Sequence, residues 1–247
     1  MLYPTPTEQL LSGGFINGFS RSVSDPLIAV SHFDLAHFHD DLLTQFAVPL
    51  PATLQRAVNK RKAEYLASRL LVRNVLADFG HPNFLLTNAP DRSPRWPDNL
   101  NASLSHSQGI AVLAVTRQAL CVGVDVEHVM AEKTAQETAR MLMNQEEQQR
   151  LASLPLTLAE GATLLFSLKE SLYKALWPKL HEVMDFHQAA LVEIDLPAGK
   201  ALLRLEHHFN ADFPRGTLLE AAFTPVNEHV ITLVTYDANK KPAQQVG

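Results

Sequence analysis

Acidic side chains recur at short spacing in two segments that otherwise have the composition of buried structure. In GVDVE, residues 123–127, Asp125 and Glu127 stand two positions apart among valines. If this segment is a strand, both carboxylates lie on one face with their Cα atoms about 6.5 Å apart. Burying two carboxylates is costly unless a cation or a basic group neutralises them. The segment therefore indicates a cation site, and the alternative is an edge strand whose polar face lies in water.

A second acidic position lies in FSLKESLYKAL, residues 166–176. Leucines at every fourth position predict the buried side of a helix. Glu170 and Lys174 then share another side of that helix, about 6 Å apart at i and i+4. The alternative is an ordinary surface ion pair that contributes a few tenths of a kcal/mol.

A third segment, SLSHS at residues 103–107, leads into a valine-rich run. Alternation along an extended chain places its three serine hydroxyls on one face, where they can donate to an anion. His106 can join them from the turn. The alternative is a polar loop that precedes a buried strand.

Together these residues suit a hard cation that bridges to a phosphorylated ligand. Asp125, Glu127 and Glu170 supply only oxygen ligands, which favours Mg²⁺, with Mn²⁺ as a second choice. Lys174 and His106 can neutralise charge that develops on a transferred phosphate. Basic residues that can hold a second phosphate are Lys60, Arg61, Lys62, Arg69, Arg73 and Arg92.

The elements that position these residues are a long helix and several strands in each half of the chain. The first 20 residues lack hydrophobic periodicity and predict an arm of loops. A helix is predicted over residues 54–79, with Gly80 as its C-cap, and another over the polar stretch 133–153. A third helix is predicted to begin at a capping box formed by Thr157 and Glu160 and to end at about Trp177, because Pro178 should stop it. Strands are predicted over residues 27–33, 111–115 and 120–126, with four more between residues 189 and 236. A shift in composition near residues 116–119 marks the boundary between residues 1–118 and 119–247.

Composition excludes several classes of protein. The chain has 247 residues, 46% of them apolar, and carries 21 Lys and Arg against 26 Asp and Glu, a formal charge of −5. A strongly basic nucleic-acid-binding protein is therefore excluded. The single cysteine excludes an internal disulfide and a cysteine-cluster metal site. No secretory signal or membrane span is recognisable, which predicts a soluble, cytoplasmic protein.

Five segments, in their order along the chain and at their separations, resemble those of a known family. GVDVE, FSLKESLYKAL and SLSHS resemble the signature motifs of the Sfp-type 4′-phosphopantetheinyl transferases. The upstream segments KRKAEYLASR (residues 60–69) and RSPRWP (residues 92–97) resemble the siderophore branch of this family, which contains the enterobactin synthetase component D. The similarity covers roughly residues 33–176. Ser68 stands where the family commonly has glycine, and Leu104 replaces a frequent isoleucine, but neither is a candidate ligand.

The resemblance implies an α+β, pseudo-twofold fold, in which two similar α/β halves enclose the active site in a cleft. It implies an enzyme that moves the phosphopantetheine arm of coenzyme A to a serine of an apo acyl, peptidyl or aryl carrier protein and releases 3′,5′-ADP. The first half would bind the phosphates of coenzyme A, and the second half would hold the metal and the catalytic residues. By position in the motifs, the implied metal ligands are Asp125, Glu127 and Glu170. The implied catalytic residues are Glu170 as general base, Lys174 beside the pyrophosphate, and His106. The implied phosphate and nucleotide contacts are Arg61, Arg69, Arg92, Ser105, His106 and Lys174.

The resemblance also implies a monomer that binds carrier proteins through the variable segment 128–153. It favours siderophore assembly, and the natural carrier is left open. Two other readings of the same residues stay open: a magnesium-dependent nucleotide phosphohydrolase, and a coenzyme A-binding protein without enzymatic activity.

Overall fold

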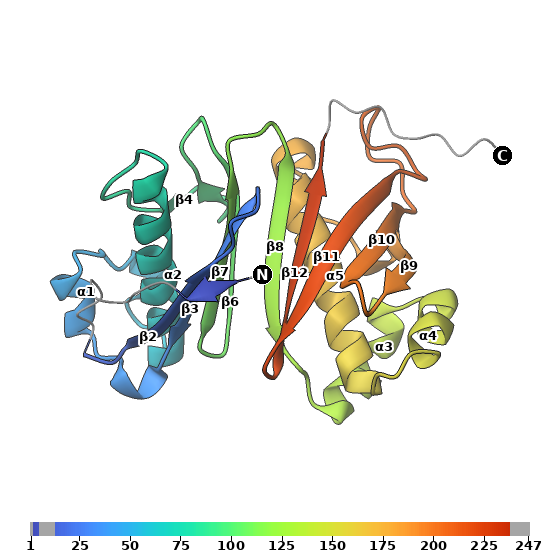
Figure 1. Cartoon of the computed structure of the whole chain (residues 1–247), viewed down its shortest axis with the longest axis horizontal. Helices are drawn as coiled ribbons and strands as arrows, with labels where there is room; N and C mark the ends of the chain where they lie inside the picture. The colour runs from blue at the N-terminus through green and yellow to red at the C-terminus, as the bar shows by residue number, and fades with distance from the viewer. Residues whose placement is uncertain (1, 5–12, 238–247) are drawn as a thin grey trace. The chain divides into compact units, whose positions relative to one another are not determined.

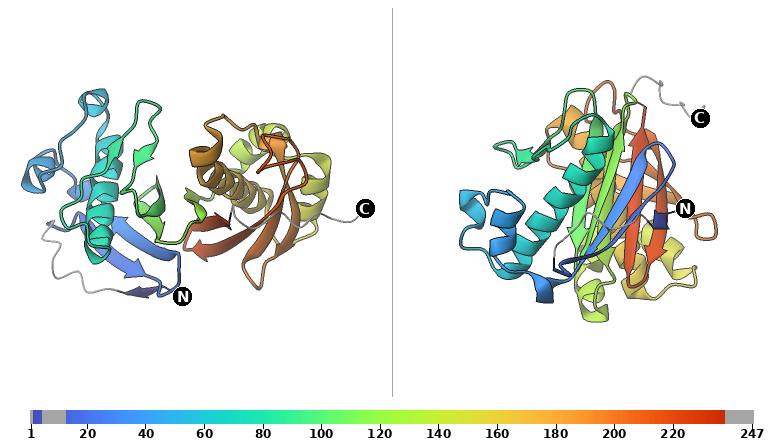
Figure 2. Two further views of the ribbon diagram at one scale, coloured as in Figure 1. Left: turned by 90° about the horizontal axis from the view of Figure 1, so that it is seen from above. Right: turned by 60° about the vertical axis from the view of Figure 1, so that its left-hand side comes forward.

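The computed structural model describes residues 2–4 and 13–237. The chain divides into two compact units, Met1–Arg117 and Gln118–Gly247. Each unit contains a five-stranded sheet, antiparallel throughout, and one long helix that packs on it (Figures 1 and 2). The chain therefore has the mixed helix and sheet content that its resemblance implies.

The first unit is built around the helix α2, Asn59–Asp78, which packs against strands β3, β6 and β7. Its strands pair in the order β1-β2-β3-β7-β6. The elements of this unit are β1 (Tyr3–Pro4), β2 (Ile16–Arg21), β3 (Leu27–Phe33), a 3₁₀ turn (Leu35–His37), α1 (Asp41–Gln45), a 3₁₀ turn (Ala52–Leu54), α2, the short hairpin β4 (Thr87–Asn88) and β5 (Pro94–Arg95), β6 (Asn101–Ser107) and β7 (Ile110–Thr116).

Two predictions for this unit need correction. The expected arm of loops contains the strand β2, because Phe15, Ile16 and Phe19 are buried and pair this segment with β3. Residues 5–12 of the predicted arm lie outside the described residues. The helix expected from residue 54 begins at Asn59, because the carbonyl of Val58 accepts the first amides of α2 and residues before it form a 3₁₀ turn. Gly80 has φ +88° and ends the helix as predicted.

The second unit is built around the helix α5, Leu158–Leu180, which packs against β8 and β12. Its strands pair in the order β8-β12-β11-β10-β9. The elements of this unit are β8 (Cys121–His128), α3 (Glu132–Leu142), α4 (Gln145–Ala152), α5, a 3₁₀ turn (Phe186–Gln188), β9 (Ala189–Asp195), β10 (Lys200–Leu205), β11 (Leu218–Val226) and β12 (His229–Tyr236). The predicted leucine stripe of α5 is buried throughout.

Two helix boundaries in this unit also differ from expectation. The polar stretch at residues 133–153 is two helices, because Asn144 ends the first and caps the second through a capping box with Glu147. Pro178 does not stop α5, which continues to Leu180 and ends at His181 in a left-handed conformation with φ +49°. Proline lacks the amide that would donate to the carbonyl four residues earlier, and α5 ends two residues after it.

The two units share one pattern of connections. In the first unit β3 is followed by α2 and then by strands of which the last, β7, pairs antiparallel with β3. In the second unit β8 is followed by α5 and then by strands of which the last, β12, pairs antiparallel with β8. In each unit the strand that precedes the long helix therefore pairs with the last strand of its sheet.

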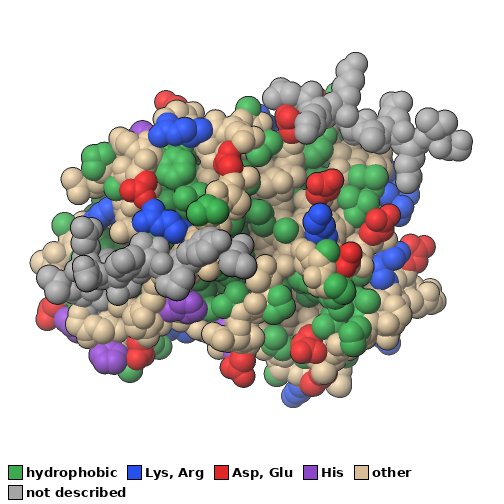
Figure 3. Space-filling view, in the orientation of Figure 1, with side chains coloured by type: hydrophobic (Ala, Val, Ile, Leu, Met, Phe, Trp, Pro, Cys, Tyr) green, Lys and Arg blue, Asp and Glu red, His purple; other side chains and the backbone are tan. Residues whose placement is uncertain are grey.

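Surface features agree with the composition. On the face shown in Figure 3, Lys and Arg side chains are interspersed with acidic ones and do not form a continuous patch. Nucleic-acid-binding surfaces are typically basic over a whole face or stripe. No helix within residues 2–4 and 13–237 has both the length and the apolar composition needed to cross a lipid bilayer.

Candidate active site

Asp125 is the most deeply buried of the predicted metal ligands. It lies on β8 and is 2% exposed. Its Oδ2 accepts a hydrogen bond from Ser167 Oγ at 2.8 Å, and its Oδ1 lies 2.6 Å from Lys174 Nζ. Both partners belong to α5, so the contact between the strand and the helix fixes the carboxylate. A hydrogen-bonded and ion-paired carboxylate is the form in which a buried charge is tolerated.

Small residues bring α5 close enough to β8 for these contacts. A Cβ atom on Gly123 would lie 1.8 Å from the Ser171 carbonyl oxygen, so only glycine fits at this crossing. On the neighbouring strand, Thr232 Oγ1 donates to the Ser167 carbonyl and lies 2.6 Å from Ser171 Oγ. The glycine of GVDVE and the serines of FSLKESLYKAL therefore position the acidic residues by allowing a close approach.

Glu170 lies one turn before Lys174 on α5 and is half-buried. Burial raises the pKa of its carboxyl, the positive charge of Lys174 lowers it, and the negative charge of Asp125 raises it further. Helical spacing places Glu170 on the side of α5 that also carries Lys174. Glu170 lines a hollow of about 230 Å³ with Lys169, Tyr173 and Met184, and neither Asp125 nor Lys174 lines that hollow.

The third predicted metal ligand, Glu127, is two residues along β8 from Asp125 and shares its face of the strand by alternation. Within residues 2–4 and 13–237, no three His, Cys, Asp or Glu side chains are gathered closely enough to form a metal-binding group. The assignment of Asp125, Glu127 and Glu170 as metal ligands therefore stays a prediction.

Lys169, next to Glu170 in the sequence, has a structural environment. It is 4% exposed and pairs with Glu147, which is fully buried. Its Nζ also donates to the carbonyl oxygens of Leu142 and Phe186 at 2.9 and 2.8 Å. A fully satisfied buried ion pair of this kind ties α3, α4 and the segment after α5 to one helix.

In the first unit, Arg69 is a buried cation whose partners are neutral. It is 8% exposed, and burial lowers the pKa of its guanidinium. Its Nη1 donates to Ser68 Oγ, its Nη2 donates to Asn88 Oδ1 at 2.7 Å, and the guanidinium carbon lies 3.9 Å from the centre of the Tyr65 ring. Its Nε has no hydrogen-bond partner among the described residues. Burying a charge without a counter-ion is expensive, so this environment favours binding of an anion.

Asn88 connects Arg69 to the loop that carries Arg92. Its side-chain amide accepts from Arg69 and donates to the Arg92 carbonyl oxygen. Arg92 itself is exposed and has φ +71°, a left-handed conformation that costs a non-glycine residue about 1 kcal/mol or more. The predicted nucleotide contacts Arg69 and Arg92 are therefore brought together by a residue that the motif analysis did not select.

His106 and Ser105 lie on opposite sides of β6. His106 Nδ1 lies 3.6 Å from Glu64 Oε2 on α2, so its ring faces the helix. Ser105 is buried and points to the other face by alternation. Arg61 Nη1 donates to the same Glu64 oxygen at 3.3 Å. Arg61 and His106 are thus brought together by Glu64, and Ser105 is not part of that group.

Sequence reasoning did not single out Glu64, Asn88 or Ser167. Glu64 carried one available signal, because it follows Arg61 by three residues on the predicted helix and interrupts its buried side. Asn88 and Ser167 are common residue types whose contacts come from segments 19 and 42 positions away. Such contacts leave no local pattern.

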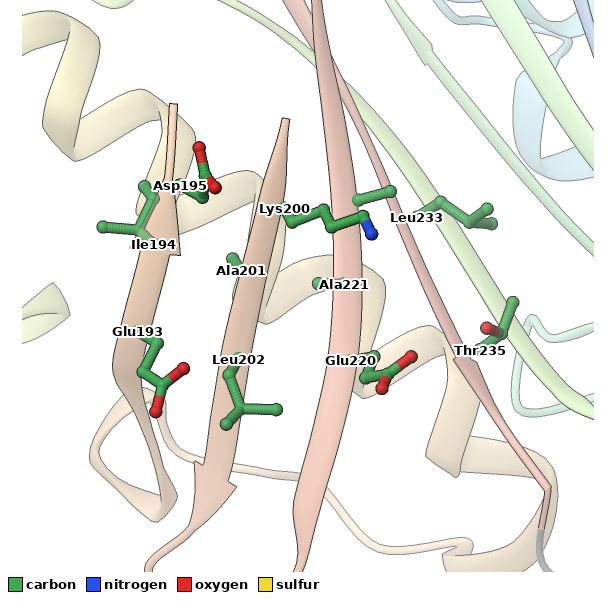
Figure 4. A pocket seen from close by; sticks show the side chains of 11 residues that line it. Glu193, Ile194, Asp195, Lys200, Ala201, Leu202, Glu220, Ala221, Leu233 and Thr235 are labelled. Carbon is green, nitrogen blue, oxygen red and sulfur yellow. The ribbon is translucent and has the colours of Figure 1, made fainter. Parts of the chain in front are cut away.

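A larger hollow lies away from all the predicted site residues. It measures about 510 Å³ and occupies the face of β9–β12 opposite to α5 (Figure 4). Leu202 and Leu233 line it together with the charged side chains of Glu193, Lys200 and Glu220. It contains none of the groups described above, so the candidate site is defined by the chemistry of its residues and not by the size of a hollow.

Comparisons with known proteins identify the family. Residues 50–116 match the 4′-phosphopantetheinyl transferase N-terminal domain, and residues 121–234 match the 4′-phosphopantetheinyl transferase superfamily. The chain is 35% identical over 221 residues to the enterobactin synthase component D of Salmonella austin, which covers 88% of this chain and 89% of that protein. It is 41% identical over 146 residues to the component D of Salmonella typhi, covering 58% and 59%, and 30% identical over 182 residues to the 4′-phosphopantetheinyl transferase Svp of Streptomyces mobaraensis, covering 73% and 74%. The chain therefore belongs to the 4′-phosphopantetheinyl transferase superfamily, as its five sequence motifs predict.

Proposed function

We propose that this protein transfers the 4′-phosphopantetheine arm of coenzyme A to a serine of an apo carrier protein and releases 3′,5′-ADP. Family membership makes it a transferase. The observation that carries the proposal is the group formed by Asp125, Glu170 and Lys174, where α5 crosses β8. It combines the Asp125–Lys174 ion pair with a second carboxylate one helical turn from Lys174, and carboxylates that hold a metal beside a cation that neutralises phosphate charge are typical of phosphoryl-transfer sites.

We assign the nucleotide end of coenzyme A to basic residues of the first unit. Arg69 supports this assignment, because it is a buried guanidinium with neutral partners. Arg92, connected to it through Asn88, supplies a second exposed cation. Arg61 and His106 both face the carboxylate of Glu64, and we include them among the proposed phosphate contacts. Ser105 remains a proposed contact through the face of β6 opposite to His106.

The acidic residues of the second unit fit a hard divalent cation. Mg²⁺ is typically held by one or two carboxylates together with phosphate oxygens of the substrate. Asp125 and Glu170 provide these two carboxylates, and Glu127 on the same face of β8 is the proposed third ligand. A bound Mg²⁺ would neutralise negative charge on the pyrophosphate. Manganese has the same preference for oxygen ligands and is expected to replace it.

The protein's own groups account for the proton and for part of the charge. The serine Oγ of the carrier forms a bond to the phosphorus that bears the pantetheine arm. The bond from that phosphorus to the bridging oxygen breaks, and the oxygen leaves with 3′,5′-ADP. Glu170 accepts the serine proton directly or through a water, and the raised pKa of its carboxyl makes it a stronger base. Lys174 lies next to it and stabilises the charge on the pyrophosphate.

We further propose that the two units form the pseudo-twofold arrangement of the family, with the active site in the cleft between them. The common order of strand, long helix and returning strand in both units supports this. In this proposal residues 1–118 bind the coenzyme A phosphates, and residues 119–247 hold the metal and the catalytic groups. We also propose a cytoplasmic monomer that acts on the carrier domains of siderophore assembly, since enterobactin synthase component D proteins are among its relatives.

The proposal is tested by incubating the purified protein with coenzyme A, Mg²⁺ and an apo carrier protein and then weighing the carrier. We expect the carrier to gain the mass of one phosphopantetheine unit. A chelator should abolish the transfer, and added Mg²⁺ should restore it. Glu170→Gln should lower turnover about 10²- to 10⁴-fold, the usual contribution of a general base, while affinity for coenzyme A falls less.

The matched control is Glu160→Gln on the same helix. Glu160 forms the capping box with Thr157 and touches no proposed ligand, so this variant should lose about 1 kcal/mol of stability and keep its turnover. Hydrolysis of coenzyme A without transfer would support the phosphohydrolase reading. Binding of coenzyme A without any reaction would support the non-enzymatic reading. Turnover of a folded Glu170→Gln protein at the wild-type rate would refute the assignment of Glu170 as base.

A further inference from the structure

Glu64 is a buried acid on α2 whose contacts are both with proposed phosphate-binding residues. It is 4% exposed. Its Oε2 accepts from Arg61 Nη1 at 3.3 Å and lies 3.6 Å from His106 Nδ1. One carboxylate oxygen therefore holds a guanidinium from its own helix and an imidazole from strand β6.

This arrangement contributes little to folding. The Arg61 side chain is 62% exposed, and ion pairs with such solvated partners add little stability. The carboxylate nevertheless loses most of its hydration, which opposes folding. An apolar side chain at this buried position would avoid that cost. The benefit of an acid at position 64 must then lie in what it does to its two partners.

The benefit that the geometry offers is orientation. A hydrogen bond to Glu64 restricts the long Arg61 side chain, which would otherwise populate many rotamers. In the protonated imidazole both ring nitrogens are donors, so with Nδ1 of His106 turned toward the carboxylate, Nε2 on the far side of the ring can donate to a phosphate. The shared oxygen thus sets both the place of the guanidinium and the direction of the imidazole.

The charge pattern of α2 indicates that these groups are arranged for an anion. Three consecutive cations, Lys60, Arg61 and Lys62, occupy the first turn of this helix, which contains no acidic residue. Positive side chains at the positive end of a helix repel its dipole, and an anion relieves that repulsion. Lys62 is paired with Asp40 at 2.8 Å. Arg61 contacts the same oxygen of Glu64 as His106 does.

We propose that Glu64 is a positioning residue for coenzyme A, which holds Arg61 and His106 in the orientation that binds the 3′-phosphate of its ribose. Glu64 itself does not touch the ligand in this proposal. The inference rests on the proposed function, because it takes coenzyme A as the ligand of these cations.

The test is calorimetric titration of Glu64→Gln with coenzyme A and with dephospho-coenzyme A, which lacks the 3′-phosphate. We expect affinity for coenzyme A to fall about 10- to 100-fold, the loss typical when a residue that orients a binding side chain is removed. Affinity for dephospho-coenzyme A should change much less. The loss should appear more in the KM for coenzyme A than in turnover at saturating coenzyme A and carrier, because Glu64 itself does not touch the reacting groups.

A double-mutant cycle shows whether Glu64 acts through His106. Glu64→Gln should weaken coenzyme A binding less in the His106→Ala background than in the wild type, since only Arg61 is then left for Glu64 to orient. Asp40→Asn removes the same charge from another ion pair of α2 and should not weaken binding. If Glu64→Gln does not fold, Glu64→Asp keeps the charge but withdraws the carboxylate, and it should show a smaller loss with the same preference.

The outcomes separate this proposal from the proposed function. Wild-type protein that transfers phosphopantetheine, with a folded Glu64→Gln variant of unchanged affinity for coenzyme A, would overturn the positioning role alone. Equal losses for coenzyme A and dephospho-coenzyme A, or additive losses in the double variant, would also overturn it. Wild-type protein that does not transfer at all would overturn the proposed function.

Discussion

Replacing Gly123 by alanine should damage both the stability of the second unit and its chemistry. The added Cβ would lie 1.8 Å from the Ser171 carbonyl oxygen and 2.5 Å from the Ala175 amide nitrogen. Real Cβ atoms essentially never come within 3.0 Å of such atoms, so α5 and β8 must separate by about 1 Å or more. Both obstacles are backbone atoms, and no side-chain rotation relieves the clash.

The magnitude follows from that displacement. Overpacking of a core costs about 1–3 kcal/mol, and a clash with backbone places Gly123→Ala at about 3 kcal/mol or above. We expect the melting temperature of the variant to fall by roughly 10 °C. Ser171 is the neighbour of Glu170 on α5, so the same shift moves Glu170 and Lys174 away from Asp125. A misplacement of about 1 Å typically costs about 100-fold in rate.

The assay combines thermal unfolding with the carrier-transfer reaction at a temperature where the variant is folded. Gly161→Ala is the matched control, because it makes the same substitution on α5 where the nearest atom lies 3.6 Å away. It should raise stability by about 1 kcal/mol, since alanine favours a helix over glycine. A Gly123→Ala protein with a wild-type melting temperature and turnover would refute the account of the crossing of α5 and β8.

Three further predictions concern the other contacts. Burial raises the pKa of Glu170, so its ionisation opposes folding as the pH rises above the pKa that this group has in the unfolded chain. Glu170→Gln should therefore raise the melting temperature of the metal-free protein near pH 7 and leave it unchanged below about pH 4. An equal gain in melting temperature at both pH values would contradict the electrostatic origin. Asn88→Ala should weaken coenzyme A binding about tenfold in a titration, because it releases Arg69 and the Arg92 loop, and unchanged binding would remove Asn88 from the site. Lys169→Met should lower the free energy of unfolding, measured in urea, by about 3–5 kcal/mol, because it leaves the buried carboxylate of Glu147 unpaired. A variant that keeps wild-type stability but loses turnover would show that Lys169 has a catalytic role instead.

The sequence alone predicts the elements that carry the site. The candidate strand at residues 27–33 and the alternation in residues 229–236 predict β3 and β12 with the bounds that they have in the structure. The leucine stripe predicts which side of α5 is buried, and the five motifs predict the family. These features are local, because side-chain periodicity follows from the geometry of the backbone itself.

Sequence reasoning was less successful where a boundary depends on packing. The strand β2 lies in a segment rich in glycine and proline, and its pairing with β3 outweighs the weak local pattern. Pro178 predicts the end of α5 at Trp177, but the helix continues to Leu180 and ends at His181, which has a left-handed conformation. Asn144 divides a polar stretch that has helical composition throughout.

Only the tertiary structure decides which charged groups meet. Helical spacing places Glu170 next to Lys174, but the packing of α5 on β8 puts the Lys174 ammonium 2.6 Å from Asp125. The two neighbours Lys169 and Glu170 are both charged residues of one motif, yet Lys169 is 4% exposed in an ion pair with Glu147 and Glu170 is only half-buried. Glu64 meets His106 across 42 residues because α2 packs on the sheet that contains β6. The energy of a charge depends on its burial and on partners within a few ångströms, and both are fixed by contacts between segments that are distant in the chain.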